Sequence, residues 1–89
     1  MIRKQVRFRG RVQGVGFRAT TRSIAGGHAV SGWVRNEADG SVLLEAQGEA
    51  AAVRAFLEDV AARLSRNIDS ADERDAPVAP GEALFEIRR

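Results

Sequence analysis

Two hydrophobic periods alternate along the chain, and their order constrains the fold more than any other feature of the sequence. Residues 2–12 alternate apolar side chains with arginines, which is typical of a strand with one buried face. Residues 17–25 then carry apolar side chains at helical spacing and can form a short helix. The pair Gly26-Gly27 should end this helix, because glycine is favoured just beyond a helix C-terminus. The chain therefore begins with a strand and a short helix.

A hairpin should follow. Residues 30–36 and 41–47 both have strand character, with apolar and polar positions in short runs. Asp39-Gly40 lies between them and is a strong hairpin signal, since this pair suits the tight turns that join twisted strands. We expect the two strands to pair antiparallel.

The longest helical pattern covers residues 49–66, where apolar side chains recur at steps of three and four. Residues 67–82 are polar, acidic and interrupted by two prolines. They predict a weak strand over 68–75, poor in β-branched residues, and then a turn. Alternation returns in a final short strand over 84–88.

This order of elements is that of the ferredoxin-like split βαβ arrangement, with one strand added at the end. We therefore expect an α+β sandwich in which two helices cover one face of an antiparallel sheet. Residues 1–89 should form a single domain, because the length suits one core and no repeat or linker divides the chain.

The composition excludes several classes of function. The chain has no cysteine and one histidine, so we expect no disulfide, no metal site and no cofactor. No apolar run is long enough to span a membrane, and the N-terminus lacks the apolar core of a signal peptide. We expect a cytoplasmic monomer with no membrane partner.

Charge is distributed unevenly along the chain. Residues 1–36 contain eight Lys or Arg and no acid, whereas residues 37–89 contain six Arg and twelve acidic residues. The basic part could attract a phosphorylated small molecule or a nucleic acid. Most of its charges are explained more simply as solvated strand residues, since basic side chains are usually exposed. Arg18 differs, because its neighbours are glycines and apolar residues.

The segment from Gln13 to Arg18 has the features of an anion-binding loop. Gly14 and Gly16 allow positive φ, so that successive N–H groups can converge on one point. A helix that begins near Phe17 adds free N–H groups and positive partial charge at the same place. Arg18 supplies a planar fork of donors, which suits a phosphate or another tetrahedral oxyanion.

Two motifs resemble the signatures of the acylphosphatase family. Gly10-Arg-Val-Gln-Gly-Val-Gly-Phe-Arg18 is similar to the first signature. Gly32-Trp-Val-Arg-Asn36, followed by Asp39-Gly40, is similar to the second, and the spacing between the two is similar as well. The chain departs from the family pattern at Gly26-Gly27, which should shorten the first helix, and in the polar residues 68–75.

The resemblance implies that the protein is an enzyme that hydrolyses acyl phosphates to carboxylate and inorganic phosphate. It places the substrate phosphate in a loop made of Gln13, Gly14, Val15, Gly16, Phe17 and Arg18. It implies two catalytic residues, Arg18 to bind the phosphate and Asn36 to position the water. Because metal ligands are missing, we expect a metal-independent reaction, with inorganic phosphate or sulfate as a competing anion.

Other interpretations of the same residues stay open. Gly14, Gly16 and Ala19 also fit a dinucleotide-binding pattern, but the strand before them carries arginines where that fold needs a strand buried on both faces. The main alternative is a ferredoxin-like module that binds RNA or an anion without catalysis, although no aromatic stacking platform is visible and we do not expect nucleic-acid binding. A purely structural domain is another, as is a module similar to one in hydrogenase-maturation carbamoyltransferases. Arg35 either assists the anion or pairs with a strand neighbour.

Overall fold

All seven predicted elements are present in the expected order. The structure is a computed structural model that describes residues 1–89. In chain order the elements are β1 (Ile2–Gly10), α1 (Phe17–Ala25), β2 (Ser31–Asn36), β3 (Val42–Gly48), α2 (Ala50–Arg63), β4 (Ile68–Asp75) and β5 (Phe85–Arg88). The predicted bounds of α1 and β4 match the observed ones, and the other elements differ by one to three residues at their ends.

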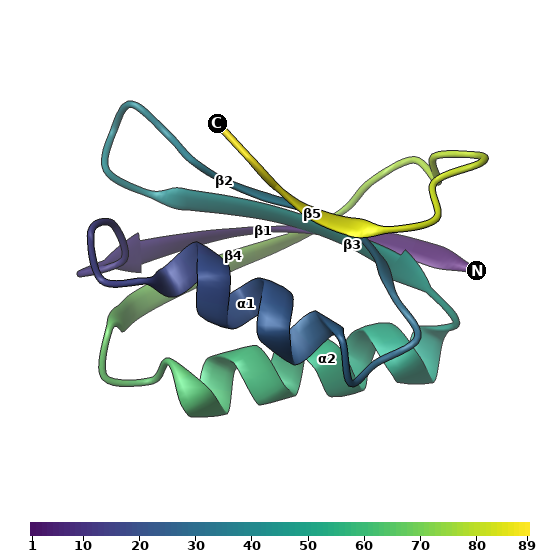
Figure 1. Ribbon diagram of the computed structural model, residues 1–89, viewed down its shortest axis with the longest axis horizontal. Coiled ribbons are helices and arrows are strands. Elements are labelled where there is room, and N and C mark those ends of the chain that lie inside the picture. Colours follow the sequence, from purple (N-terminus) through teal and green to yellow (C-terminus); the bar gives the residue numbers. More distant parts are fainter.

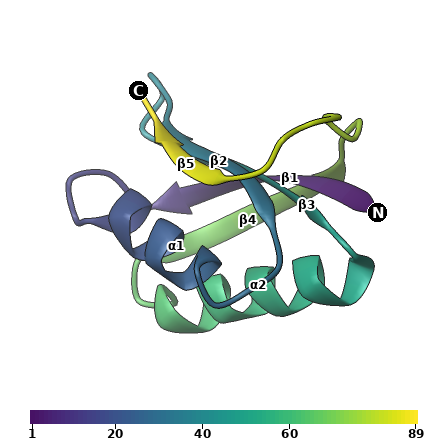
Figure 2. The ribbon, with the colours of Figure 1, turned by 45° about the vertical axis from the view of Figure 1, so that its right-hand side comes forward.

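The five strands form one sheet in the order β4-β1-β3-β2-β5, and both helices lie on one face of it (Figure 1, Figure 2). β1 pairs antiparallel with β3 and β4, and β2 pairs antiparallel with β3. The exception to the predicted antiparallel sheet is β5, which pairs parallel with β2. β4 runs opposite to β2, so β4 ends at the edge of the sheet where β2 begins. Residues 76–84 then cross to the other side of the sheet, and β5 starts beside the beginning of β2 and runs parallel to it.

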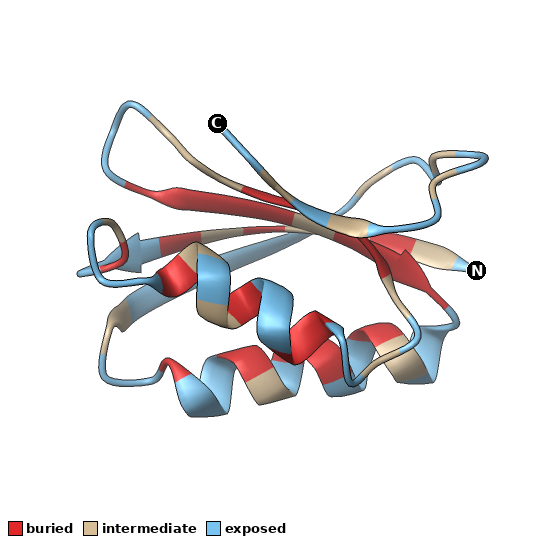
Figure 3. Cartoon of the chain, in the orientation of Figure 1, coloured by how far each residue is buried: buried red, intermediate tan, exposed pale blue.

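The core lies between the sheet and the helices, where the inner sides of both helices are buried (Figure 3). The predicted stripe of α2 is part of it, since Val53, Phe56 and Val60 are fully buried. They belong to one cluster with the sheet residues Val34 and Leu44. Burial of this stripe and of the inner sheet face is the main force that holds α2 in place. No helix is both long and apolar enough to cross a membrane.

α1 ends at the predicted glycine pair, but without a left-handed cap. Gly26 has φ −62° and ψ −19°, so it continues the right-handed conformation for one more residue. The chain then turns through His28, whose Nε2 lies 3.1 Å from Oδ2 of Asp59 on α2. The end of α1 is thereby joined to the second helix.

One arginine of β1 is buried, whereas most basic side chains in this part of the chain were expected to be solvated. Arg3 is 4% exposed and lies on the sheet face opposite the helices, between Glu45 and Glu82. Its Nη1 is 2.8 Å from Glu82 Oε1 and 2.9 Å from Gln47 Oε1. Burial opposes ionisation of Glu82, but the hydrogen bond from Arg3 helps to outweigh it and lowers the pKa of that carboxyl. These bonds hold residues 76–84 against the sheet. Arg3 is shielded from solvent because this segment covers it.

β4 is the least buried of the longer strands. It lies at a sheet edge, and every residue after Ile68 is exposed. Ala71 stands beside a groove of about 180 Å³, whose apolar lining includes Phe8 and Leu57. The low content of β-branched residues in β4 therefore leaves apolar surface of the core partly uncovered.

We expect Ala71→Val to raise the free energy of unfolding by about 1 kcal/mol, since the added methyl groups enter the groove and valine favours strands. Urea denaturation measures the change. The matched control is Ser70→Val, which pairs opposite Arg9 on the other sheet face and gains strand propensity without the groove. Equal stabilisation by both variants would contradict a contribution from the groove.

Candidate active site

The loop before α1 has the backbone conformation that the glycines predict. Gly14 and Gly16 have φ angles of 75° and 78°. A Cβ at either position would meet no atom within 4 Å, so the backbone conformation, and not a lack of space, favours glycine there. The Gly16 carbonyl accepts a hydrogen bond from the Thr20 N–H at 3.0 Å. The N–H groups of the first helical turn have no partner inside the helix and can bind an anion.

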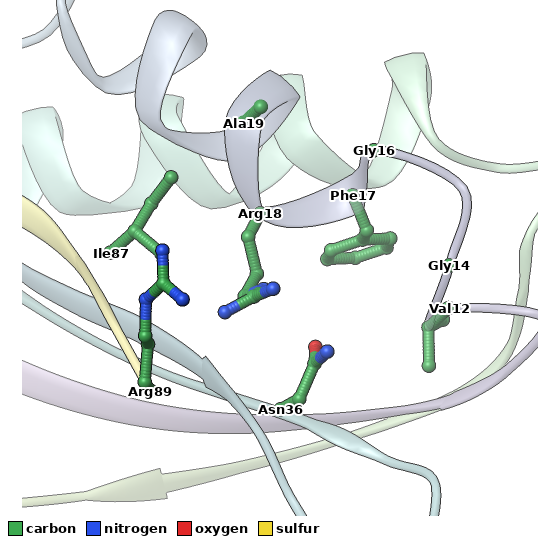
Figure 4. A pocket seen from close by; sticks show the side chains of 9 residues that line it. All are labelled: Val12, Gly14, Gly16, Phe17, Arg18, Ala19, Asn36, Ile87 and Arg89. Carbon is green, nitrogen blue, oxygen red and sulfur yellow. The ribbon is translucent and has the colours of Figure 1, made fainter.

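Two arginine side chains reach the same pocket (Figure 4). Arg18 comes from the first turn of α1, is half-buried, and donates from Nη1 to the backbone carbonyl of Arg88 at 3.2 Å. Arg89 follows β5 and enters from the other side. No acidic side chain lines this pocket. The pocket therefore carries positive side-chain charge that no acidic side chain in its lining compensates.

Asn36 is the last residue of β2, and its side chain points toward Arg18 (Figure 4). Its Oδ1 is buried and accepts no hydrogen bond from the protein. Leaving a buried acceptor unpaired costs about 1–3 kcal/mol, which is rarely tolerated without a reason. Asn36 thus lines the pocket together with Arg18, and its side-chain acceptor has no partner in the protein.

The pocket has a volume of about 270 Å³ and lies between the glycine loop, α1 and the ends of β2 and β5. Its lining consists of Val12, Gly14, Gly16, Phe17, Arg18, Ala19, Asn36, Ile87 and Arg89. The sequence-based site did not include Val12, Ala19, Ile87 and Arg89. The alternation of the last strand places Ile87 on the helix side, but no sequence pattern points to Arg89, which lies beyond that strand.

Two residues of the predicted loop do not line the pocket. Val15 is 43% exposed at the tip of the loop. The Gln13 side chain turns away, and its Nε2 donates to the carbonyls of Glu37 and Ser41 at 2.7 and 2.8 Å. Phe17 does line the pocket, and its ring is buried against Phe8 with 5.3 Å between ring centroids. Any contact of Gln13 or Val15 with an anion would have to come from the backbone.

Arg35 pairs with a strand neighbour and does not line the pocket. Its Nε donates to Glu37 at 2.8 Å, and its guanidinium lies 4.8 Å from the centre of the Trp33 ring. Arg88 covers the same ring at 5.0 Å, so that Trp33 is only 7% exposed. The single aromatic side chain on this sheet face is therefore covered, and the RNA-binding alternative is not favoured.

The turn after Asn36 is held by Asp39. This carboxylate accepts hydrogen bonds from the Ser41 N–H at 2.9 Å and the Ser41 hydroxyl at 2.6 Å. These bonds, with a smaller contribution from Arg9, lower the pKa of Asp39 to about 2. Asp39 therefore stays ionised and keeps the hairpin closed well below neutral pH.

Comparison with known proteins assigns this chain to a family. The acylphosphatase family model matches residues 4–87, which is nearly the whole chain. The chain belongs to the acylphosphatase family. An acylphosphatase of Salinibacter ruber is 48% identical over 98% of this chain and 93% of its own length. An acylphosphatase of Oceanobacillus iheyensis is 59% identical over 63% of this chain, a match that spans 62% of that relative.

The solved structure of acylphosphatase from Bacillus subtilis has the same fold. It superposes on this chain with a TM-score of 0.88 and 29% sequence identity, and the match covers both chains fully. The ferredoxin-like α+β fold and the resemblance based on two motifs are thus confirmed. In the present chain the first motif contains the glycine loop and Arg18, the second ends at Asn36, and the two meet at one pocket.

Proposed function

We propose that this protein hydrolyses acyl phosphates to a carboxylate and inorganic phosphate without a metal ion. The observation that carries the proposal is the convergence of Arg18 and Asn36 on one pocket that no acidic side chain lines. Membership of the acylphosphatase family supports the same reaction.

Arg18 and the backbone of the glycine loop hold the phosphoryl group. The guanidinium fork contacts two phosphoryl oxygens, and N–H groups at the start of α1 contact the third. In phosphoryl transfer the charge of the transition state lies on these oxygens, so catalysis comes mainly from positioning and electrostatic stabilisation. A cationic pocket without acidic side chains is suited to both.

Asn36 positions the attacking water through its side-chain amide, which offers both a donor and an acceptor and whose Oδ1 has no partner in the protein. The water oxygen forms a bond to phosphorus, the bond between phosphorus and the acyl oxygen breaks, and the acyl group leaves as a carboxylate. The conjugate acid of this leaving group has a pKa of about 4, so no general acid is needed. The water's proton passes to a phosphoryl oxygen of the substrate, since neither a histidine nor an acid lines the pocket.

The purified protein should hydrolyse an aromatic acyl phosphate in the presence of EDTA, because its own side chains and N–H groups supply the charge that a metal would otherwise provide. Inorganic phosphate and sulfate should inhibit competitively. Steady-state assays with and without EDTA measure both effects. Activity that disappears on chelation and returns with Mg²⁺ or Zn²⁺ would refute the metal-independent mechanism. Non-competitive inhibition by phosphate would show that the substrate does not bind at this loop.

Phenyl phosphate is the matched control substrate. It offers the same phosphoryl group, but its leaving group has a pKa of about 10 and needs protonation. Since the pocket contains no general acid, we expect no hydrolysis of phenyl phosphate under conditions in which the acyl phosphate is consumed.

A further inference from the structure

The amide of Gln13 ties the glycine loop to the hairpin that carries Asn36. Its two N–H donors are both used, one on the carbonyl of Glu37 at 2.7 Å and one on the carbonyl of Ser41 at 2.8 Å. Glu37 directly follows Asn36, and Ser41 lies at the other end of the same turn. One side chain thus holds both ends of the turn.

No other hydrogen bond connects residues 11–15 with the rest of the protein. Apart from Gln13, only the buried side chain of Val12 anchors the loop, and Gly14 and Val15 are exposed. Glycines with positive φ make the backbone there easy to displace. The position of the loop relative to β2 therefore depends on Gln13.

Arg18 and Asn36 come from different elements and form no hydrogen bond with each other. Each can be well ordered within its own element while the distance between them varies. A displacement of about 1 Å between reacting groups can cost about 100-fold in rate, so this distance matters for turnover. It matters less for anion binding, because the guanidinium and N–H donors come from the loop, from α1 and from the residue after β5, and none comes from β2.

We infer that Gln13 is a positioning residue that fixes the water site at Asn36 relative to the bound phosphoryl group. The inference rests on the proposed function. Gln13 itself does not touch the substrate, and its side chain acts through the hairpin. This role differs from that of a phosphate ligand, which was the expectation from the sequence.

The test is Gln13→Met, which keeps the length of the side chain and removes both donors. We expect kcat to fall about tenfold, a fraction of the loss that a full 1 Å displacement can cause. The inhibition constant of inorganic phosphate should stay within about twofold, less than 1 kcal/mol. The matched control is Gln5→Met on the other sheet face, whose amide donates to Glu45 at 2.8 Å; it should leave both constants unchanged.

A double variant shows whether Gln13 acts through Asn36. Gln13→Met combined with Asn36→Ala should have the same kcat as Asn36→Ala alone, because a water site that is already lost cannot be misplaced. The inference would be overturned if the double variant lost kcat by the product of the two single losses. It would also be overturned if Gln13→Met kept its kcat or was inhibited more weakly by phosphate. If instead Asn36→Ala alone keeps full kcat, the water step of the proposed function is the part that fails.

If Gln13→Met does not fold, Gln13→Asn replaces it. The shorter amide keeps its donors but cannot reach both carbonyls, so kcat should fall while phosphate inhibition persists. Full activity of Gln13→Asn would likewise overturn the inference.

Discussion

Arg18→Ala should lower kcat/KM by about a thousandfold or more, on the scale of an arginine that stabilises a phosphoryl transition state. Inhibition by inorganic phosphate should be lost together with turnover, because the same guanidinium serves both. Arg18→Lys should be almost as inactive, since lysine keeps the charge but not the planar fork that contacts two oxygens. Steady-state kinetics with phosphate as inhibitor give both values.

Arg22→Ala is the matched control for this prediction. Arg22 lies one turn further along α1, is exposed, forms no ion pair and is absent from the pocket lining. Its removal changes the net charge equally, so a comparable loss in Arg22→Ala would assign the effect to long-range charge. Near-normal turnover of Arg18→Lys would show that the geometry of the fork is unimportant.

Asn36→Ala should lower kcat by about 100-fold, the scale of a lost positioning group, because the water loses its alignment in the transition state. Phosphate affinity should change by about threefold at most, under ~1 kcal/mol, since Asn36 is neutral. The fold should be retained, because Oδ1 has no partner in the protein whose loss would destabilise it. Kinetics, phosphate inhibition and thermal melting separate these effects.

Asn67→Ala provides the comparison, since Asn67 is the other asparagine of the chain and lies outside the pocket. It should keep full turnover. If Asn36→Ala mainly loses phosphate binding, Asn36 belongs to the anion site; if it stays folded with an unchanged kcat, it does not position the water.

The elements of the fold could be predicted because each has a local signal. The stripe of α2, the glycines that begin and end α1, and the turn at Asp39-Gly40 all depend on residues close in sequence. Even the weakly patterned β4 was predicted, since alternatives for a polar segment between a helix and prolines are few. The parallel pairing of β5 was not, because it depends on a crossing over the whole sheet.

The features of the fold and of the site that were not predicted depend on contacts between distant residues. The arginines of β1 look alike in sequence, yet Arg3 is buried because residues 76–84 cover it. Gln13 lies inside a phosphate-binding motif, but two carbonyls of a distant turn determine its direction. Arg89 reaches the pocket only through the docking of β5. Residue type was enough to select Arg18 and Asn36 as candidates, whereas the direction of each side chain depends on the tertiary structure.

The polar sequence of β4 also affects whether its edge can pair with the edge of another molecule. An edge strand exposes unpaired N–H and C=O groups that can template pairing with a second chain. Charged residues occupy five of the eight positions of β4, and four of them are acidic. Charged side chains on an edge strand oppose its pairing with a second edge, and with it the growth of cross-β fibrils from folded molecules. The residues that leave β4 loosely packed within one chain therefore also oppose edge-to-edge association between chains.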